Sequence, residues 1–91
     1  MNQRLPALTA REVIRALEHA GFVVSRTSGS HCRLIHVRDP ARKVTIPVHS
    51  GDLKRGTLRG IIGQAGVTVA EVSALLYALM RPLPAIFRSG G

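Results

Sequence analysis

The 91-residue sequence predicts a single α+β domain, in which one helix is followed by three antiparallel strands and two more helices. Two observations predict this order. Apolar residues recur at helical spacing in three segments, and between the first two segments they alternate with polar residues, as in strands buried on one face. A chain of this length has room for one thin hydrophobic core. We therefore expect one domain at residues 5–80 and a flexible C-terminal tail at residues 81–91.

The first helix is predicted to begin at a capping box. Thr9 is followed three residues later by Glu12, and in this pattern the two side chains accept each other's backbone N–H groups. Gly21 can adopt the left-handed conformation that ends a helix. Between them the apolar residues fall on one face, which predicts an amphipathic helix that covers a sheet: Val13, Ile14, Leu17 and Ala20.

Three strands are predicted where the apolar residues recur at every second position. The first strand leads from Phe22 to a tight turn at Ser28-Gly29, the second covers residues 30–37, and the third covers residues 43–47. The expected inward residues are Phe22, Val24, Cys32, Leu34, Val44 and Ile46. The expected outward residues are Ser25, Thr27, His31, Arg33 and Ile35. This gives an antiparallel sheet with one apolar face and one polar, basic face.

Two further helices follow the sheet. The first of them is predicted to start near Gly56, with Thr57 as its N-cap, and to end at Gly66. The second opens with another capping box, Thr68 to Glu71, and two prolines, Pro82 and Pro84, follow it. The predicted buried stripes are Leu58, Ile61, Ile62 and Ala65 in one helix and Val72, Leu75, Leu76 and Leu79 in the other.

The composition narrows the function classes. Thirteen Lys and Arg stand against five Asp and Glu, a net charge of +8, which predicts a polyanionic partner: nucleic acid, an acidic protein or an anionic membrane. No apolar stretch is long enough for a membrane span and no signal-peptide pattern is present, so we expect a cytoplasmic protein without a membrane partner. With two Phe, one Tyr and no Trp, recognition of bases by a row of aromatic side chains is disfavoured. The single cysteine, Cys32, excludes an intrachain disulfide.

Four stretches together resemble the HicA family of messenger-RNA interferase toxins. They are LEHAGF at residues 17–22, Gly29-Ser30-His31, IPVHSG at residues 46–51 and KRGTLRGI at residues 54–61. Each piece is weak alone, but their order and spacing are specific. The resemblance covers most of the chain and implies a fold like that of the double-stranded RNA-binding domain, an α-β-β-β-α sandwich with an additional C-terminal helix. It also implies ribosome-independent cleavage of mRNA, neutralisation by a HicB antitoxin, and a catalytic role for His31.

The chemistry of RNA cleavage is compatible with that role. RNA carries its own nucleophile, the 2′-hydroxyl, so cleavage needs a base, cations for the phosphate charge and in-line geometry. Imidazole ordinarily titrates near neutrality. Arg33 leaves the strand on the same side as His31, Gly29 allows close approach of the backbone, and Ser30 offers a hydroxyl to a phosphate. This scheme requires no metal or other cofactor, and the five acidic residues are too dispersed to hold Mg²⁺. An exposed histidine without function is the alternative interpretation, which the surrounding motif outweighs.

Other basic residues extend the predicted RNA site. Lys54, Arg55 and Arg59 cluster at the start of the second helix, where free backbone N–H groups attract anions; the alternative is a solvated basic face. Arg42 and Lys43 flank a turn and could continue the path along RNA. Two interpretations of His49 remain open: a general acid or phosphate contact, or a residue that only shapes its loop. We expect no functional role for His19 or His36.

The sequence therefore predicts a HicA-type endoribonuclease that binds mRNA through Gly29, Ser30, Arg33, Lys43, His49, Lys54, Arg55 and Arg59 and cleaves it with His31. Its expected partner is an acidic HicB-like antitoxin in a hetero-oligomer, covering the open sheet face. Two alternatives remain. One is a non-catalytic RNA-binding module of the same fold, and the other is an interaction protein whose basic face docks an acidic partner without RNA.

Overall fold

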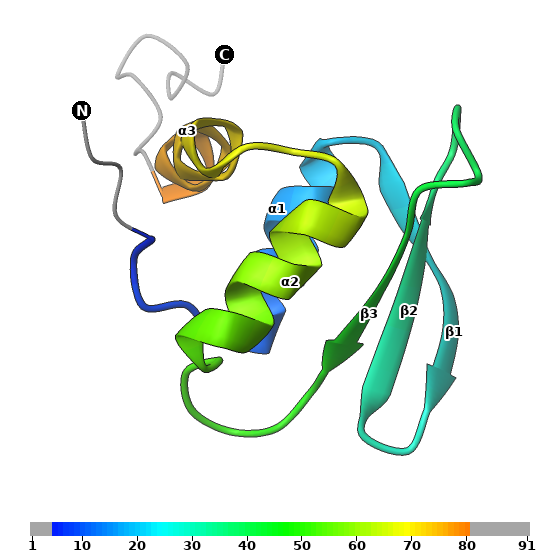
Figure 1. Cartoon of the computed structure of the whole chain (residues 1–91), viewed down its shortest axis with the longest axis horizontal. Helices are drawn as coiled ribbons and strands as arrows, with labels where there is room; N and C mark the ends of the chain where they lie inside the picture. Colours follow the sequence, from blue (N-terminus) through cyan, green and yellow to red (C-terminus); the bar gives the residue numbers. More distant parts are fainter. Residues whose placement is uncertain (1–4, 81–91) are drawn as a thin grey trace, which may run out of the picture.

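The computed structural model describes residues 5–80 and has the predicted order of elements (Figure 1). These elements are α1 (Ala10–His19), β1 (Phe22–Ser28), β2 (His31–His36), β3 (Lys43–Pro47), α2 (Arg55–Ala65) and α3 (Val69–Met80). The strands form one antiparallel sheet in the order β1-β2-β3. Helices α1 and α2 cover one face of the sheet, α3 packs against α1, and the other face is uncovered (Figure 1). This confirms the α-β-β-β-α layout with an additional helix, which is compatible with a fold like that of the double-stranded RNA-binding domain.

Both predicted capping boxes are present. At α1, the Glu12 N–H donates to the Thr9 hydroxyl at 3.2 Å and the Thr9 N–H donates to the Glu12 carboxylate at 2.9 Å. At α3, the Glu71 N–H donates to the Thr68 hydroxyl at 3.0 Å and the Thr68 N–H donates to the Glu71 carboxylate at 2.7 Å. Because each box depends on residues three positions apart, it can be recognised from the sequence alone.

The predicted start of α2 is wrong. The helix begins at Arg55, with Lys54 as an N-cap that makes no side-chain hydrogen bond, so Thr57 lies inside the first turn. The physical reason is the residue just before the cap. Leu53 is buried, and its N–H donates to the Leu8 carbonyl at 2.8 Å, which fixes the chain against the segment before α1 directly before the helix begins. Helix α2 ends as predicted, with Gly66 in the left-handed conformation at φ +73°.

The core lies between the helices and the sheet. Every apolar residue predicted to face inward on α2, β2 and β3 is buried there, including Cys32. In α1, Ile14 was predicted to face the core but is only partly buried. Ala16, which was not predicted, is fully buried. The buried side chains of the described residues are Leu5, Leu8, Ala10, Val13, Ala16, Leu17, Phe22, Cys32, Leu34, Val44, Ile46, Leu53, Leu58, Ile61, Ile62, Ala65, Val72 and Leu76.

Strand β1 departs from the predicted alternation. Val24 pairs with Leu34, but Arg26, and not Ser25, pairs with Arg33. Ser25 is therefore the extra residue of a β-bulge, and its hydroxyl donates to the Arg33 carbonyl at 3.3 Å. A bulge shifts the residues that follow it to the opposite face of the sheet.

The predicted orientation of Thr27 is wrong for this reason, and the predicted burial of Val24 is wrong for another. Thr27 is exposed but lies on the helix side of the sheet, because it pairs with Cys32, whose side chain is buried under the helices. Val24 was expected in the core, yet it is 42% exposed, since it lies on an edge strand that the helices cover incompletely. Arg26 and Ser28 point to the open face instead.

Helices α2 and α3 were also tested by their length and hydropathy as possible membrane spans. Among residues 5–80, neither α2 nor α3 alone is long and apolar enough to cross a membrane, and the two helices taken together are bent by 97° at the break between them. The predicted tail at residues 81–91, with Pro82 and Pro84, lies outside the described residues.

Candidate active site on the open sheet face

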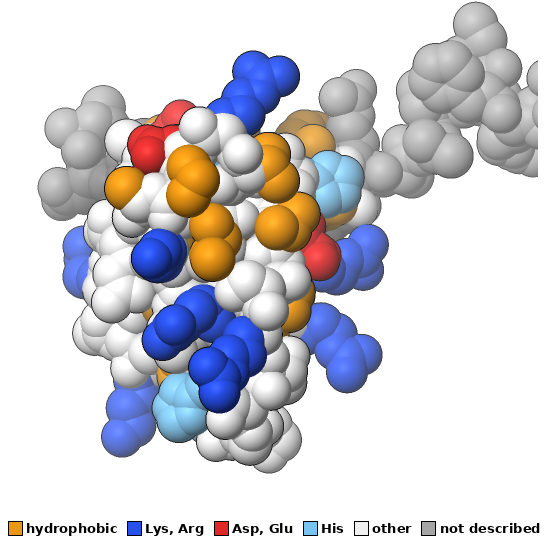
Figure 2. Space-filling view, turned by 90° about the vertical axis from the view of Figure 1, so that its right-hand side faces the viewer, with side chains coloured by type: hydrophobic (Ala, Val, Ile, Leu, Met, Phe, Trp, Pro, Cys, Tyr) orange, Lys and Arg blue, Asp and Glu red, His pale blue; other side chains and the backbone are white. Residues whose placement is uncertain are grey.

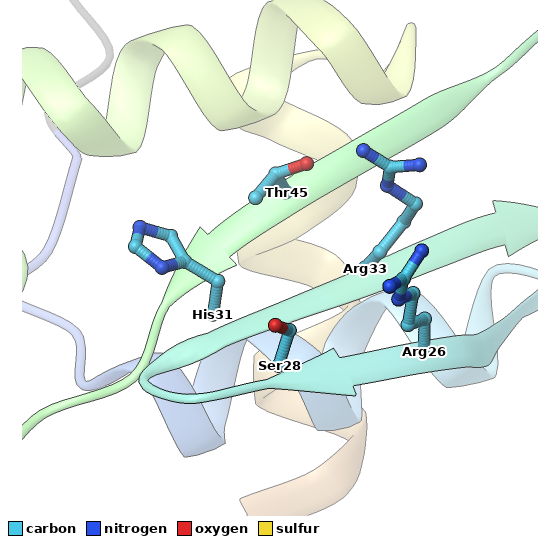
Figure 3. Close-up of a pocket in the computed structure, with 5 residues that line it drawn as sticks. All are labelled: Arg26, Ser28, His31, Arg33 and Thr45. Carbon is cyan, nitrogen blue, oxygen red and sulfur yellow. The ribbon is translucent and has the colours of Figure 1, made fainter.

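The open face of the sheet places side chains from all three strands in rows. One row consists of Ser28, His31 and Pro47, the next of Arg26, Arg33 and Thr45, and a third of Val23, Ile35 and Lys43. The first two rows surround a shallow pocket of about 190 Å³ lined by Arg26, Ser28, His31, Arg33 and Thr45 (Figure 3). The uncovered face therefore carries a concave site built from one histidine, two guanidinium groups and two hydroxyls.

His31 lies at one end of this pocket (Figure 3). It is the first residue of β2 and directly follows the tight turn, where Gly29 has a φ of +57° that favours glycine. The imidazole is exposed, and no partner for it is found within residues 5–80. Its two ring nitrogens are therefore available to a bound substrate.

The serine hydroxyl in the pocket belongs to Ser28 and not to Ser30. Ser28 lines the pocket beside His31, whereas Ser30 and Gly29 form the exposed turn next to it. The Ser30 carbonyl accepts the N–H of Val48, so the loop after β3 is held against this turn. Ser30 therefore joins the turn to the loop that carries His49.

Three residues of the pocket were not predicted from the sequence, namely Arg26, Ser28 and Thr45, and Arg26 is the charged one. Strict alternation from Phe22 places residue 26 toward the core, and only the bulge at Ser25 turns Arg26 to the open face, opposite Arg33. A signal was present, because an arginine at an inward strand position would bury an unpaired charge. Figure 3 shows both guanidinium groups extending above the same side of the sheet, and within the described part of the chain neither has an ion-pair or hydrogen-bond partner.

Lys43 and its neighbour Arg42 have opposite orientations. Lys43 is exposed on the open face, in the row next to Arg33 and Thr45. The Arg42 Nε donates to the Ala65 carbonyl at 2.8 Å, and its guanidinium lies 5.4 Å from the centre of the Phe22 ring. Lys43 therefore lies on the basic open face, whereas Arg42 ties the start of β3 to the end of α2.

The remaining predicted RNA contacts lie around one end of the molecule. The β1–β2 turn, the loop after β3 and the starts of α1 and α2 are at this same end (Figure 1). His49 is exposed there and lines a different depression, next to Arg11, with its Nδ1 atom 3.4 Å from the neighbouring Ser50 carbonyl. The structure does not bring His49 into the pocket of His31.

The three basic residues near the start of α2 differ in their surroundings. Lys54 and Arg59 are exposed, and no side-chain partner is found for them among residues 5–80. Arg55 is also exposed, but its Nη1 atom donates to the Leu5 carbonyl at 3.2 Å, so it holds the segment before α1. Lys54 and Arg59 are thus free to contact an anion, and Arg55 is partly committed to the fold.

His36 and His19 lie outside the pocket and differ in their surroundings. The His36 ring lies between the Ala20 carbonyl and the Arg38 N–H, each at 3.1 Å, and packs edge-on against Phe22, which is the structural role expected for it. His19 is exposed in the last turn of α1. Within the described residues, no three His, Cys, Asp or Glu side chains are grouped so that they could hold a metal ion.

A family model described as the HicA toxin of bacterial toxin–antitoxin systems matches residues 10–67, more than half of the chain. The chain belongs to the HicA toxin family. No curated protein matches it. The matched segment of this HicA chain begins with α1, contains the sheet with the whole pocket, and ends just after α2, so α3 lies outside it. Membership in the family makes this chain a toxin of a toxin–antitoxin system, with an antitoxin as the partner that such a system implies.

Proposed function

We propose that this HicA toxin is an endoribonuclease that cleaves messenger RNA with His31 as its acid and base. The observation that supports the proposal best is the pocket on the open sheet face. An exposed histidine lies in one concave site with two arginines, and within residues 5–80 no partner occupies its ring nitrogens and no acid neutralises either guanidinium. A base next to unneutralised guanidinium groups is the minimum that cleavage by the 2′-hydroxyl of RNA requires.

In the proposed reaction, His31 removes the proton from a ribose 2′-hydroxyl. The 2′-oxygen then attacks the adjacent phosphorus, and the bond from phosphorus to the 5′-oxygen of the next nucleotide breaks. The imidazolium formed on His31 returns its proton to that leaving oxygen. The products are one strand that ends in a 2′,3′-cyclic phosphate and one strand that begins with a 5′-hydroxyl. No metal ion has to supply a nucleophile in this scheme, because the substrate carries it.

The surrounding residues are proposed to bind the RNA backbone on both sides of the pocket. Lys43 continues the basic face beyond Arg33. On the other side the Gly29-Ser30 turn leads to the loop of His49 and then to Lys54 and Arg59 at α2. Contacts to phosphates supply affinity without base specificity, so this path fits a nuclease that acts on many messages.

We further propose that the antitoxin is an acidic, HicB-like protein that covers the open sheet face. The chain has a net charge of +8, and the cations that attract RNA also steer an acidic protein toward the same surface. Figure 2 looks onto this face and shows that Lys and Arg side chains lie next to a patch of hydrophobic ones. Val23 and Val37 are 48% and 57% exposed. Ile35, on the central strand β2, is paired with Val23 on the same open face. Apolar contacts of this kind suit a protein surface better than a phosphate backbone. Both partners place the toxin in the cytoplasm.

The products of the wild-type toxin test this proposal. Purified toxin is incubated with RNA in the presence of EDTA, and the ends of the fragments are identified by mass spectrometry. We expect cyclic phosphate and 5′-hydroxyl ends. RNA binding without fragments would support a non-catalytic RNA-binding module instead, and the absence of any RNA affinity at low salt would support a pure interaction protein.

A further inference from the structure

Arg26 and Arg33 are directly opposite each other on the open face of neighbouring strands. Opposed residues of an antiparallel pair have Cβ atoms roughly 5 Å apart, and like charges in such positions destabilise a sheet. Within the described residues no acidic side chain compensates either guanidinium. A bulge at Ser25 creates this arrangement, since regular pairing after Val24 would oppose Ser25 to Arg33. The chain therefore has an unfavourable charge pair that its fold does not need.

The surroundings of the pair identify the kind of ligand that offsets this repulsion. Both guanidinium groups line the pocket that also contains His31, and the hydroxyls of Ser28 and Thr45 lie in the same two rows. Guanidinium groups present planar forks of N–H donors that match the oxygens of a phosphate. A single phosphodiester has two non-bridging oxygens, so each of the two guanidinium groups can donate to one of them.

The position of the pair indicates which phosphate it binds. His31 and Arg33 are two residues apart on β2, a separation of roughly 6.6 Å along a strand, and His31 lies at one end of the pocket with Arg26 and Arg33 at the other, on the same side of the sheet (Figure 3). A phosphate group in this pocket would be within reach of both arginines while its ribose lies against the imidazole of His31. We infer that Arg26 and Arg33 together form a binding site for the phosphodiester that is cleaved, with Arg26 as a second cationic contact. This inference rests on the proposed function for the identity of its ligand.

A direct test uses inorganic phosphate and no cleavage. The toxin with ¹⁵N-labelled arginine is titrated with phosphate, and the side-chain Nε–H signals are followed by NMR. We expect the signals of Arg26 and Arg33 to shift with one common dissociation constant and the signal of Arg15, an exposed residue of α1, to stay in place. The phosphate-induced shift at Arg26 should be lost in Arg33→Gln. Equal shifts at Arg15, or no shift at either pocket arginine, would overturn the inference.

A second test uses RNA that cannot be cleaved. A single strand with 2′-O-methyl groups at every ribose has no free nucleophile, so its affinity is independent of catalysis. We expect Arg26→Gln and Arg33→Gln each to weaken its binding roughly tenfold, and the matched control Arg15→Gln to leave it nearly unchanged. Because each variant removes a like-charge neighbour, thermal unfolding should occur at an unchanged or higher temperature.

The results of these tests distinguish a failure of the phosphate site from a failure of the proposed nuclease function. Phosphate binding by both arginines without any cleavage of natural RNA would leave the site in place and refute the nuclease. Cleavage by His31 with unaltered rate and affinity in Arg26→Gln would refute the joint site and leave the nuclease in place.

Discussion

Gly21 packs directly under the imidazole of His36. A Cβ atom added to Gly21 would lie 2.8 Å from the His36 Nε2 atom, and the backbone of Gly21 has a φ of +103°. His36 ends β2 and its Nε2 atom is hydrogen-bonded to the Ala20 carbonyl. This contact therefore joins the end of α1 to the far end of the strand that begins with His31.

Replacement of Gly21 by alanine should destabilise the fold. The backbone conformation alone costs an L-residue about 1–2 kcal/mol, and displacement of the His36 ring adds to this. Gly63→Ala is the matched control, because Gly63 is in α2 with open space around it, and alanine there should raise the free energy of unfolding by about 0.5–1 kcal/mol. Urea unfolding of both variants measures the difference. Equal midpoints would show that the close packing at Gly21 has no energetic importance.

Substitution of Arg42 should lower the stability of the fold, whereas substitution of its neighbour Lys43 should weaken RNA binding. Arg42→Ala removes the hydrogen bond to the Ala65 carbonyl and the contact with Phe22, so we expect a loss of about 1–3 kcal/mol of stability. Lys43→Ala should leave stability within about 0.5 kcal/mol and weaken RNA binding. Chemical unfolding and RNA titration of both variants decide this. If Lys43→Ala were the less stable of the two variants, the structural role of Arg42 and the binding role of Lys43 would both be wrong.

The cations at α2 should contribute to the salt dependence of RNA binding. Neutralisation of Lys54 and Arg59 together is expected to reduce the slope of log Kd against log salt by roughly 0.7 for each contact with single-stranded RNA. Arg55 is kept, since its removal would also free the Leu5 carbonyl. The control variant neutralises Arg15 and Arg38, two other exposed arginines. An identical slope in all three proteins would exclude phosphate contacts at α2.

The docking of the antitoxin should depend on one of two neighbouring valines. Val23 and Val24 have similar exposure, but Val23 is on the open face and Val24 pairs with Leu34 on the helix side. We expect Val23→Ser to weaken binding of the proposed acidic antitoxin, and Val24→Ser to have little effect, in calorimetric titrations. Antitoxin bound beforehand should also block RNA completely. A stable complex of toxin, antitoxin and uncut RNA would contradict occlusion of the open face.

The capping boxes, the sheet and the outward positions of His31 and Arg33 could be predicted because each depends on residues close together in the sequence. The start of α2 could not, since it depends on a bond between Leu53 and Leu8, which are far apart in the chain. Arg26 was missed for a similar reason. Alternation describes one strand at a time, whereas a bulge is a property of the pairing between β1 and β2. The role proposed for His31 rests on the resemblance, because exposure alone does not distinguish a catalytic histidine from His19.

The cleavage rate of His31→Ala is the most direct measurement of the central claim. His31 is exposed at the end of a turn, so the free energy of unfolding of the variant should lie within about 0.5 kcal/mol of the wild-type value. Loss of an acid–base group should lower the rate of RNA cleavage in EDTA by about 100-fold or more, while His19→Ala, which replaces an exposed histidine on α1, should cleave at the wild-type rate. If folded His31→Ala still produced cyclic phosphate ends at a rate near that of wild type, the assignment of catalysis to His31 would be wrong.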